Sequence, residues 1–246
     1  MRSYLLIVVF LSVISCKDKI ANRNIQTVKI NGIEKTVKTD NNYKESAEKN
    51  VYSNTENFAD SLKIALTGKY KIEITQSTND TLTMVSFKLF EKENNKWKNI
   101  QNYSLQKDSD IPLLTEIKDF NNDGFNDSTI HYLAVGRGAN DVRKLFVFSK
   151  KDNQFIEIKN SDDYSNLDYN KNLNCIDALD VYSGSTTTFL KLDKNILKEF
   201  ARVNYLDGKV ESYAVRNNKE IKLYSKPYEG SSDEIIRFSN YDPIEE

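Results

Sequence analysis

Apolar and polar residues alternate with a period of two along most of the chain after Gly68. Successive side chains of a β-strand point to opposite faces of a sheet, so this alternation is typical of strands. It predicts roughly a dozen strands, in the segments KYKIEIT, TLTMVSFKLFEK, KWKNIQNYSL, LLTEIKDF, DSTIHYLAV, KLFVFSK, QFIEIK, CIDALDVYS, TTTFLKLDK, LKEFARVNYLD, KVESYAVR and KEIKLYS.

Short polar turn signals separate these predicted strands. The segments STND, KENN, KKDNQ, LDG and RNN are too short for crossover helices and are typical of hairpin turns. Strands joined by hairpins pair antiparallel. We therefore predict an all-β fold, an antiparallel meander arranged as a sandwich, a barrel or a small propeller-like array. No fixed-period repeat indicates a long regular propeller, and we assign residues 59–246 to a single domain.

The residues before this domain are mostly polar. Residues 16–58 are rich in Lys, Asn, Glu and Thr, a composition that buries too little apolar surface to offset the entropy of ordering. We interpret this segment as a tether. Within it, Asn31-Gly32 between alternating residues predicts a small hairpin at 26–38. The apolar spacing in ENFADSLKIAL, residues 56–66, also allows a short helix.

The first sixteen residues, MRSYLLIVVFLSVISC, have the pattern of a bacterial lipoprotein signal peptide. Arg2 precedes an apolar run of about ten residues, too short to span a bilayer. VISC resembles a lipobox, which implies removal of residues 1–15 and attachment of a diacylglyceryl group to Cys16. We predict a lipid-anchored protein in the cell envelope of a Gram-negative bacterium, at the outer membrane, with the leaflet left open. A plain secretory signal with an incidental cysteine is the alternative.

The composition and the near-zero net charge of the chain indicate that it recognises a partner by shape and local chemistry. The 246 residues are 39% hydrophobic and 29% charged, with 35 basic against 36 acidic side chains and a net charge of −1. Such a chain can bury a core, and it has no broad field that would attract nucleic acid or an anionic membrane surface. We expect a monomer. Cys175, the other cysteine, lies in the apolar stretch NCIDALDVY, which predicts a buried free thiol.

An acidic stretch between two predicted strands, IKDFNNDGFNDSTIHY, has the spacing of a calcium loop. Calcium takes about six to eight oxygen ligands, and a chain supplies several of them only by turning tightly. Gly124 stands where that turn needs a glycine. The predicted Ca²⁺ ligands are the side chains of Asp119, Asn121, Asp123 and Asp127 and the main-chain carbonyl of Phe125.

This acidic loop differs from an EF-hand. Ile130 occupies the position of the bidentate glutamate, and the flanks alternate like strands. The loop resembles instead the strand-loop-strand calcium loops of FG-GAP and related β-propeller blades, and it should bind calcium weakly, at about 10⁻⁴–10⁻³ M. An acidic turn without metal is the alternative. A catalytic role is disfavoured because metal ligation keeps the carboxylates ionised and occupied.

The sequence contains no recognisable catalytic motif. His131, the only histidine, lies within the predicted strand STIHYLAV, and no Ser-x-Gly elbow accompanies it, so we interpret it as structural. No H-E-x-x-H, paired C-x-x-C or phosphate-binding loop is present. We predict that the protein is not an enzyme. A glycan hydrolase that uses two carboxyl groups stays open, because its two acidic residues follow no sequence motif.

Two glycine-containing loops have the composition of contact surfaces. VGRGAND, residues 135–141, places Arg137 between two glycines, where its guanidinium can reach a carboxylate. VYSGSTTTF, residues 181–189, forms the tip of another predicted hairpin. Ordinary hairpin chemistry is the alternative for both. The candidate partner-binding residues are Arg137, Asn140, Tyr182, Ser183, Gly184 and Ser185.

The order of lipobox, tether, strands, acidic loop, glycine-rich loop and aromatic strand LFVFS resembles a family of calcium-binding periplasmic lipoproteins. That family is related to the inhibitors of invertebrate-type lysozymes and includes immunity proteins against peptidoglycan hydrolases. The likeness covers about residues 113–213. It implies that a Ser-Gly loop enters a carboxylate-lined cleft. Ser183 and Gly184 match that loop, but Thr186 replaces its usual tyrosine and Tyr182 lies before the pair.

These observations predict a membrane-anchored lipoprotein whose calcium-stabilised β domain binds a protein partner and inhibits a lysozyme-like peptidoglycan hydrolase. We expect the acidic loop to help position the glycine-containing loops. A glycan-binding or surface-assembly module on the same scaffold is the first alternative, and a glycan hydrolase is the second.

Overall fold

The protein is described here by a computed structural model, which covers residues 54–107, 110–217, 219–230 and 235–242 and the backbone of 27–30 and 33–36. The chain divides into two units, Met1–Lys49 and Asn50–Glu246. The described residues form strands and two short 3-10 helices but no α-helix. None of their helices is long and apolar enough to cross a membrane. The predicted all-β class is confirmed.

The first unit contains the hairpin that the sequence predicts. β1 (Thr27–Ile30) and β2 (Ile33–Thr36) pair antiparallel, within the predicted bounds 26–38. The proposed signal peptide, Cys16 and residues 17–26, 31–32 and 37–53 of the tether lie outside the described residues, whereas residues 54–58 belong to a strand of the second unit.

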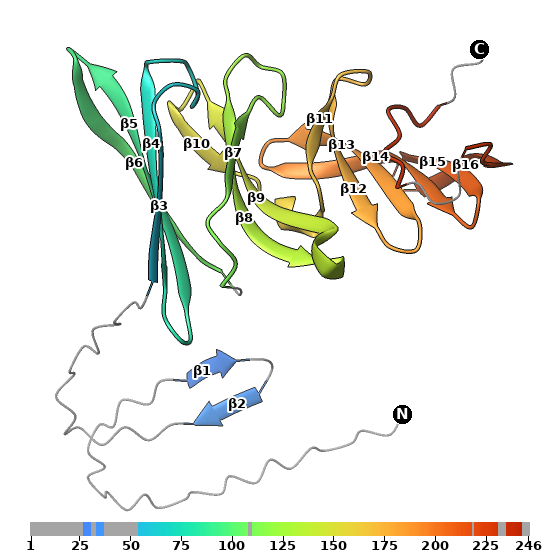
Figure 1. The fold of residues 1–246 in the computed structure, drawn as a ribbon, viewed down its shortest axis with the longest axis horizontal. Coiled ribbons are helices and arrows are strands. Elements are labelled where there is room, and N and C mark those ends of the chain that lie inside the picture. The colour runs from blue at the N-terminus through green and yellow to red at the C-terminus, as the bar shows by residue number, and fades with distance from the viewer. Residues whose placement is uncertain are drawn as a thin grey trace, which may run out of the picture. The chain divides into compact units, whose positions relative to one another are not determined.

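The described residues of the second unit form three antiparallel sheets (Figure 1). The first sheet holds β3 (Asn54–Asp60), β4 (Tyr70–Thr78), β5 (Thr83–Glu93) and β6 (Lys96–Lys107). The second holds β7 (Thr115–Lys118), β8 (Asp127–Val135), β9 (Asn140–Ser149) and β10 (Gln154–Glu157), with η1 (Gly136–Gly138) between β8 and β9 and η2 (Ser161–Asp163) after β10. The third holds β11 (Asp168–Asn170), β12 (Cys175–Val181), β13 (Ser185–Asp193), β14 (Ile196–Leu206), β15 (Lys209–Arg216) and β16 (Lys219–Pro227). Each sheet keeps its strands in sequence order, which confirms the meander, and none closes into a barrel.

Strand β3 takes the place of the short helix that the apolar spacing at 56–66 allowed. It pairs with β4 along its whole length. The chain then turns around Asp60, whose carboxylate accepts three hydrogen bonds from main-chain N–H groups. The donors are Leu62 (3.2 Å), Lys63 (2.8 Å) and Ile64 (2.8 Å). Pairing with β4 at the sheet edge outweighs the helix-like spacing of the apolar residues. The first sheet therefore begins before residue 59, the predicted start of the domain.

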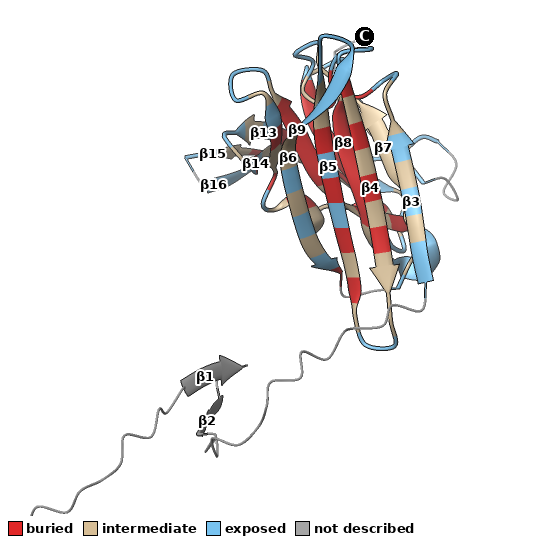
Figure 2. Cartoon of the chain, turned by 90° about the vertical axis from the view of Figure 1, so that its left-hand side faces the viewer, coloured by how far each residue is buried: buried red, intermediate tan, exposed pale blue. Residues whose placement is uncertain are grey.

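An aromatic core fills the space between the first and second sheets. Phe87 of β5 contacts Phe146 of β9 edge-on, with ring centroids 5.2 Å apart, and Phe155 of β10 at 6.0 Å. β4 and β5 bury alternate residues, seen as bands along both strands in Figure 2. The period-two pattern of these strands thus places one of their faces in this core.

The second sheet is covered on both faces. Phe146 and Phe148 of β9 face the first core, whereas Leu145 and Val147 belong to a second core against the third sheet. All four residues are buried. The segment LFVF, residues 145–148, is therefore continuously apolar, because a strand buried on both faces has no solvent-facing side.

The outer face of the third sheet is covered by residues 235–242, which we call the C-terminal strap. Tyr241 of the strap packs against Phe189 and Phe200, with ring centroids 5.8 Å away in each case. The strap forms no strand, and it closes a third core. The fold is thus a stack of sheets in which the strap takes the place of a further layer.

Candidate functional site

The two loops that the sequence singles out as contact surfaces lie side by side. Asn140, at the start of β9, donates from Nδ2 to the carbonyl of Val181 and accepts at Oδ1 from the Val181 N–H, both at 2.8 Å. Val181 ends β12, so one side chain joins the β8–β9 hairpin of the second sheet to the β12–β13 hairpin of the third. We call residues 136–138 and 182–184 together the clamped loop edge.

A second asparagine, which sequence reasoning did not identify, reinforces this clamp. Asn166 Nδ2 donates to the carbonyls of Ala139 and Leu179, both at 2.9 Å. Its main-chain N–H also donates to the Asp141 carbonyl at 2.7 Å. Asn166 has a φ of 50°, a left-handed conformation that asparagine tolerates better than most residues. An asparagine among turn residues gives no sequence signal for such a role.

Arg137 is held at the tip of the clamped loop edge. It has φ 59° and ψ 32°, between Gly136 at φ 61° and Gly138 at φ 87°. All three residues therefore have a left-handed backbone conformation, which glycine adopts readily. The side chain is exposed and forms no ion pair with any acid in the described part of the chain. Its guanidinium is available to a carboxylate on another molecule.

Tyr182 is the aromatic member of the clamped loop edge. The residue is 50% exposed, and its hydroxyl lies 3.1 Å from the Thr186 hydroxyl. The Tyr182 N–H donates to the Gly184 carbonyl at 3.0 Å, which closes the hairpin tip around Ser183. The ring is thus presented to solvent from a turn that backbone bonding fixes.

Gly184 fits where no larger residue would. A Cβ added there would lie 2.0 Å from the Tyr205 carbonyl oxygen and 3.2 Å from the Leu206 Cα. Both are main-chain atoms of β14, which cannot move aside as a flexible side chain would.

We expect Gly184→Ala to lower the free energy of unfolding by about 1–3 kcal/mol, the usual cost of forced overpacking. Chemical denaturation measures the loss. Ser183→Ala is the matched control, because Ser183 is exposed at the same tip. An equal, small effect of both substitutions would contradict the close approach of Gly184 to β14.

Two of the predicted partner-binding residues are buried and serve the fold. Asn140 is 9% exposed, and both ends of its amide are used by Val181. Ser185 is fully buried, and its hydroxyl donates to the Ile236 carbonyl of the strap at 2.8 Å. The prediction of direct contact is therefore not supported for these two residues. The clamped loop edge retains Arg137 and residues 182–184.

Exposed apolar side chains continue the surface on both sides of the clamped loop edge. They are Leu114 and Leu133 toward β7, Val135 beside the glycine loop, and Leu206 at the end of β14. A groove of about 310 Å³ adjoins Tyr182. It is lined by Tyr182, Asn204, Leu206, Asp207, Lys209 and Glu211. Exposed apolar groups rimmed by charge are typical of protein contact sites.

The acidic loop closes on itself through its own side chains. The Asp119 carboxylate accepts from the N–H groups of Asp123 (3.2 Å) and Gly124 (2.8 Å). Asp123 Oδ1 accepts from the Phe125 N–H at 2.9 Å. Asn121 Nδ2 donates to Asp123 Oδ2 at 3.0 Å. Gly124 adopts φ 87°, as the predicted tight turn requires.

Asp127, the last predicted ligand, is turned into the fold. It is fully buried, and its two oxygens accept the N–H groups of Phe120 and Phe148, both at 2.9 Å. Burial, with further contributions from the charges of Asp123 and Asp119, raises the pKa of Asp127 to about 8.

The fit of this loop to calcium is incomplete. In the part of the chain that the structure describes, no three or more His, Cys, Asp or Glu side chains are gathered to hold a metal ion. The oxygen donors themselves suit calcium, and Asp127 keeps unused lone pairs because a carboxylate can accept about four hydrogen bonds. Closing a shell would require the carboxylates of Asp119 and Asp123 to approach Asp127.

The acidic loop and the clamped loop edge lie at opposite ends of β8. The loop precedes Asp127, the first residue of this nine-residue strand, and η1 follows Val135, the last. At about 3.3 Å per residue the two are roughly 30 Å apart. The acidic loop therefore does not contact the clamped loop edge directly, and its help in positioning the contact loops stays a prediction. It instead joins sheets at the other end, where Asn126 and Ala65 exchange main-chain hydrogen bonds of 2.8 and 3.0 Å.

The residues considered for nucleophilic chemistry are buried. His131 is 8% exposed, and its Nε2 lies 3.1 Å from Asp141 Oδ1 but outside hydrogen-bond geometry. Burial is the main cause that lowers the pKa of His131. Cys175 is 6% exposed, and burial raises the pKa of its thiol to about 11, which disfavours the reactive thiolate. Both fit the structural roles that the sequence suggested.

Lys107 is a buried cation that the sequence did not reveal. It is 2% exposed, and its ammonium donates to Gln76 Oε1 at 2.7 Å and to the Ile111 carbonyl at 3.0 Å. Burial lowers its pKa to about 8. These bonds fix the start of the segment that leads from the first sheet into the second. We assign Lys107 a structural role.

Comparison with known proteins adds little to this geometry. No protein-family model matches the sequence, and no curated protein matches it. Among solved structures, the chain is similar to a Xanthomonas protein described as related to a Type IV secretion system. The TM-score is 0.46 and the sequence identity 8%, over 68% of this chain and 93% of that chain. A likeness at this level carries no argument about fold or function.

Proposed function

We propose that this chain is a lipid-anchored, non-enzymatic protein of the cell envelope that inhibits a lysozyme-like peptidoglycan hydrolase with its clamped loop edge. The observation that carries the proposal is the pair of hydrogen bonds between Asn140 and Val181. They bring together two loops of separate sheets that the sequence marks as contact surfaces. Such fixed loops lose little entropy on binding, which favours affinity.

The chemistry of the edge suits an enzyme cleft that carries carboxylates. Glycoside hydrolases of the lysozyme type act with a pair of carboxyl groups. Arg137 offers an unpaired guanidinium, which binds a carboxylate through two parallel hydrogen bonds. Tyr182 supplies an aromatic anchor of the kind enriched at the centre of protein interfaces. The glycines on either side of Arg137 keep this loop narrow.

Anchoring and calcium take supporting roles in this proposal. A lipid on Cys16 would hold the domain at the membrane, since acyl chains contribute roughly 0.8 kcal/mol for each buried CH₂ group. A calcium ion held by Asp119, Asn121, Asp123 and Asp127 and by the carbonyl of Phe125 would stabilise the end of the stack remote from the partner. The spacing of the oxygen donors around Gly124, which takes the left-handed turn that such a loop needs, supports a cation.

Adding calcium is expected to raise the melting temperature. With a dissociation constant of about 10⁻⁴–10⁻³ M, 10 mM calcium should stabilise the domain by about 1.4–2.7 kcal/mol. Thermal unfolding with calcium and with a chelator measures the shift. Asp123→Asn should abolish the shift, whereas Asp80→Asn, at an exposed turn, should keep it. Equal melting temperatures with calcium and with chelator would rule out the site.

Inhibition is tested by titrating the protein into lysozymes of the chicken, goose and invertebrate types and following the lysis of cell walls. We expect stoichiometric loss of activity for at least one type. Full activity of every type at large excess of the protein would refute inhibition. Release of soluble sugar from peptidoglycan by the protein alone would support a glycan hydrolase instead.

A further inference from the structure

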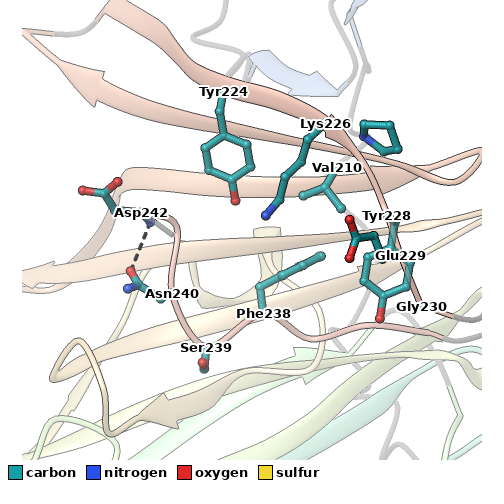
Figure 3. Close-up of a pocket in the computed structure, with 11 residues that line it drawn as sticks. Val210, Tyr224, Lys226, Tyr228, Glu229, Gly230, Phe238, Ser239, Asn240 and Asp242 are labelled. Atoms are coloured by element: carbon teal, nitrogen blue, oxygen red, sulfur yellow. Dashed lines mark hydrogen bonds between the residues drawn. The ribbon is translucent and has the colours of Figure 1, made fainter. Parts of the chain in front are cut away.

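A cavity lies over the outer face of the third sheet, between the C-terminal strap and the ends of β15 and β16 (Figure 3). Its volume is about 560 Å³, within the usual range for small-ligand sites. It is separate from the clamped loop edge, whose groove is lined by Asn204 and Leu206 on the other face of β14. The lining residues are Val210, Tyr224, Lys226, Pro227, Tyr228, Glu229, Gly230, Phe238, Ser239, Asn240 and Asp242.

One wall of the cavity is the strap, and side chains of the third sheet hold that wall in place. Thr187 accepts the Phe238 N–H at its hydroxyl oxygen (2.9 Å), and the Asn170 side chain donates to the Ser239 carbonyl (3.2 Å). The Ser212 hydroxyl donates to the strap at the Tyr241 carbonyl. These bonds fix the backbone of the wall. The site is therefore preformed rather than assembled by a ligand.

Aromatic rings face the cavity from both walls. Phe238 lies on the strap and Tyr224 on β16, and Tyr228 lies at one end of the cavity (Figure 3). Tyr228 rests edge-on against Tyr205 of β14, with ring centroids 5.0 Å apart. A Cβ at Gly230 would lie 2.4 Å from ring carbons of Tyr228, so this ring keeps its place because Gly230 has no side chain.

Polar groups occupy the rest of the lining. Lys226, Glu229 and Asp242 are exposed, and none forms an ion pair within the described chain. Asn240 Oδ1 accepts the Asp242 N–H at 3.1 Å, which leaves its amide group to the cavity. Two carboxylates against one ammonium give the lining a net negative charge, which opposes anionic ligands such as phosphates.

We propose that this cavity binds an uncharged saccharide. A pyranose ring has an apolar C–H face that stacks on tyrosine and phenylalanine, and its rim of hydroxyl groups donates to carboxylates and accepts from amide and ammonium groups. The cavity offers three rings and the polar side chains of Lys226, Glu229, Ser239, Asn240 and Asp242. The proposal stands independently of the inhibitory function, because it uses another face of the third sheet.

Calorimetric titration of the full-length protein with chitohexaose, cellohexaose and maltohexaose tests the proposal. We expect at least one of them to bind with a dissociation constant of about 1 mM or tighter. Tyr228→Ala should weaken that binding about tenfold or more, because it removes the ring on which the apolar face of the sugar would stack. Trp97→Ala, which removes an exposed ring from the first sheet, should leave it unchanged.

Gly230→Ala separates a binding role of the Tyr228 ring from a folding role. It displaces the ring without removing any lining side chain, so it should weaken saccharide binding while the melting temperature stays near that of the wild type. Lys226→Ala, at an exposed position, should weaken binding without unfolding. The proposal is overturned if none of the three hexasaccharides binds, or if Tyr228→Ala and Gly230→Ala bind as the wild type does. Tighter binding of a sulfated hexasaccharide would also overturn it.

Discussion

Replacing Arg237 by methionine is expected to lower the free energy of unfolding by about 3 kcal/mol or more. The guanidinium lies 2.6 Å from the Asp177 carboxylate and ties the strap to β12. Asp177 is 3% exposed, so the substitution would leave a buried charge without its partner. Breaking a buried ion pair from one side costs about 3–5 kcal/mol, and the partial exposure of Arg237 favours the lower figure. Urea denaturation measures the loss.

The Arg237→Met loss should depend on pH. Burial raises the pKa of Asp177, and Arg237 acts against that rise, so the substitution should raise the pKa further. A carboxyl group with a raised folded-state pKa stabilises the fold below its unfolded pKa of about 4 and loses that contribution as pH rises through the folded value. We expect a smaller loss at pH 4 than at pH 8. Adding Asp177→Asn should recover much of it. A loss unaffected by pH and by Asp177→Asn would contradict the account.

Phe87→Ala should destabilise the fold by about 3–5 kcal/mol, the cost of an unfilled aromatic site in a core. Phe87 is 2% exposed and contacts Phe146, Phe155 and Tyr103, the last stacked at 5.2 Å. With Val85 and Leu89 it is one of the β5 residues in the core between the first and second sheets. Loss of its ring would remove contacts to three strands.

The control for Phe87→Ala is Phe90→Ala, on the same strand but facing outward. Phe90 is partly exposed and lies 4.4 Å beneath the Lys71 ammonium. Its removal should cost about 1 kcal/mol. Equal losses for both variants, measured by urea denaturation, would show that the first core is not the principal contact between these sheets.

The fold could be predicted well because its local signals agree. Period-two alternation and short polar turns determine the strands and their antiparallel order, and each sheet follows the sequence. The sequence of residues 56–66 leaves a short helix possible because four apolar positions fit a helix as well as a strand. Pairing with β4 and the turn around Asp60 decide the outcome, and both depend on tertiary structure.

The candidate site could be predicted only in part. Arg137 and Tyr182 are marked by the glycines and turn residues around them, but their adjacency depends on how the sheets stack. The loop composition predicts Asn140 as a contact residue, because a buried asparagine and an exposed one look alike in sequence. The acidic loop was recognised by its spacing. Its position at the far end of β8 follows only from the strand direction.

The contacts of the C-terminal strap likewise could not be predicted from the sequence. IIRFSNYD reads as a closing segment, and nothing local indicates that Arg237 reaches Asp177, sixty residues earlier in the sequence. Ser185 illustrates the consequence. Its loop suggests a surface residue, but the strap covers it and accepts its hydrogen bond.

The most direct test of the central claim is the inhibition constant of Arg137→Glu against the hydrolase that the wild type inhibits. The account predicts at least a tenfold loss, because the substitution turns an attraction for cleft carboxylates into repulsion. Lys96→Glu, the same charge reversal at the exposed first residue of β6 in the first sheet, should inhibit as the wild type does. Equal inhibition by Arg137→Glu and the wild type would contradict the proposal that the clamped loop edge binds the partner.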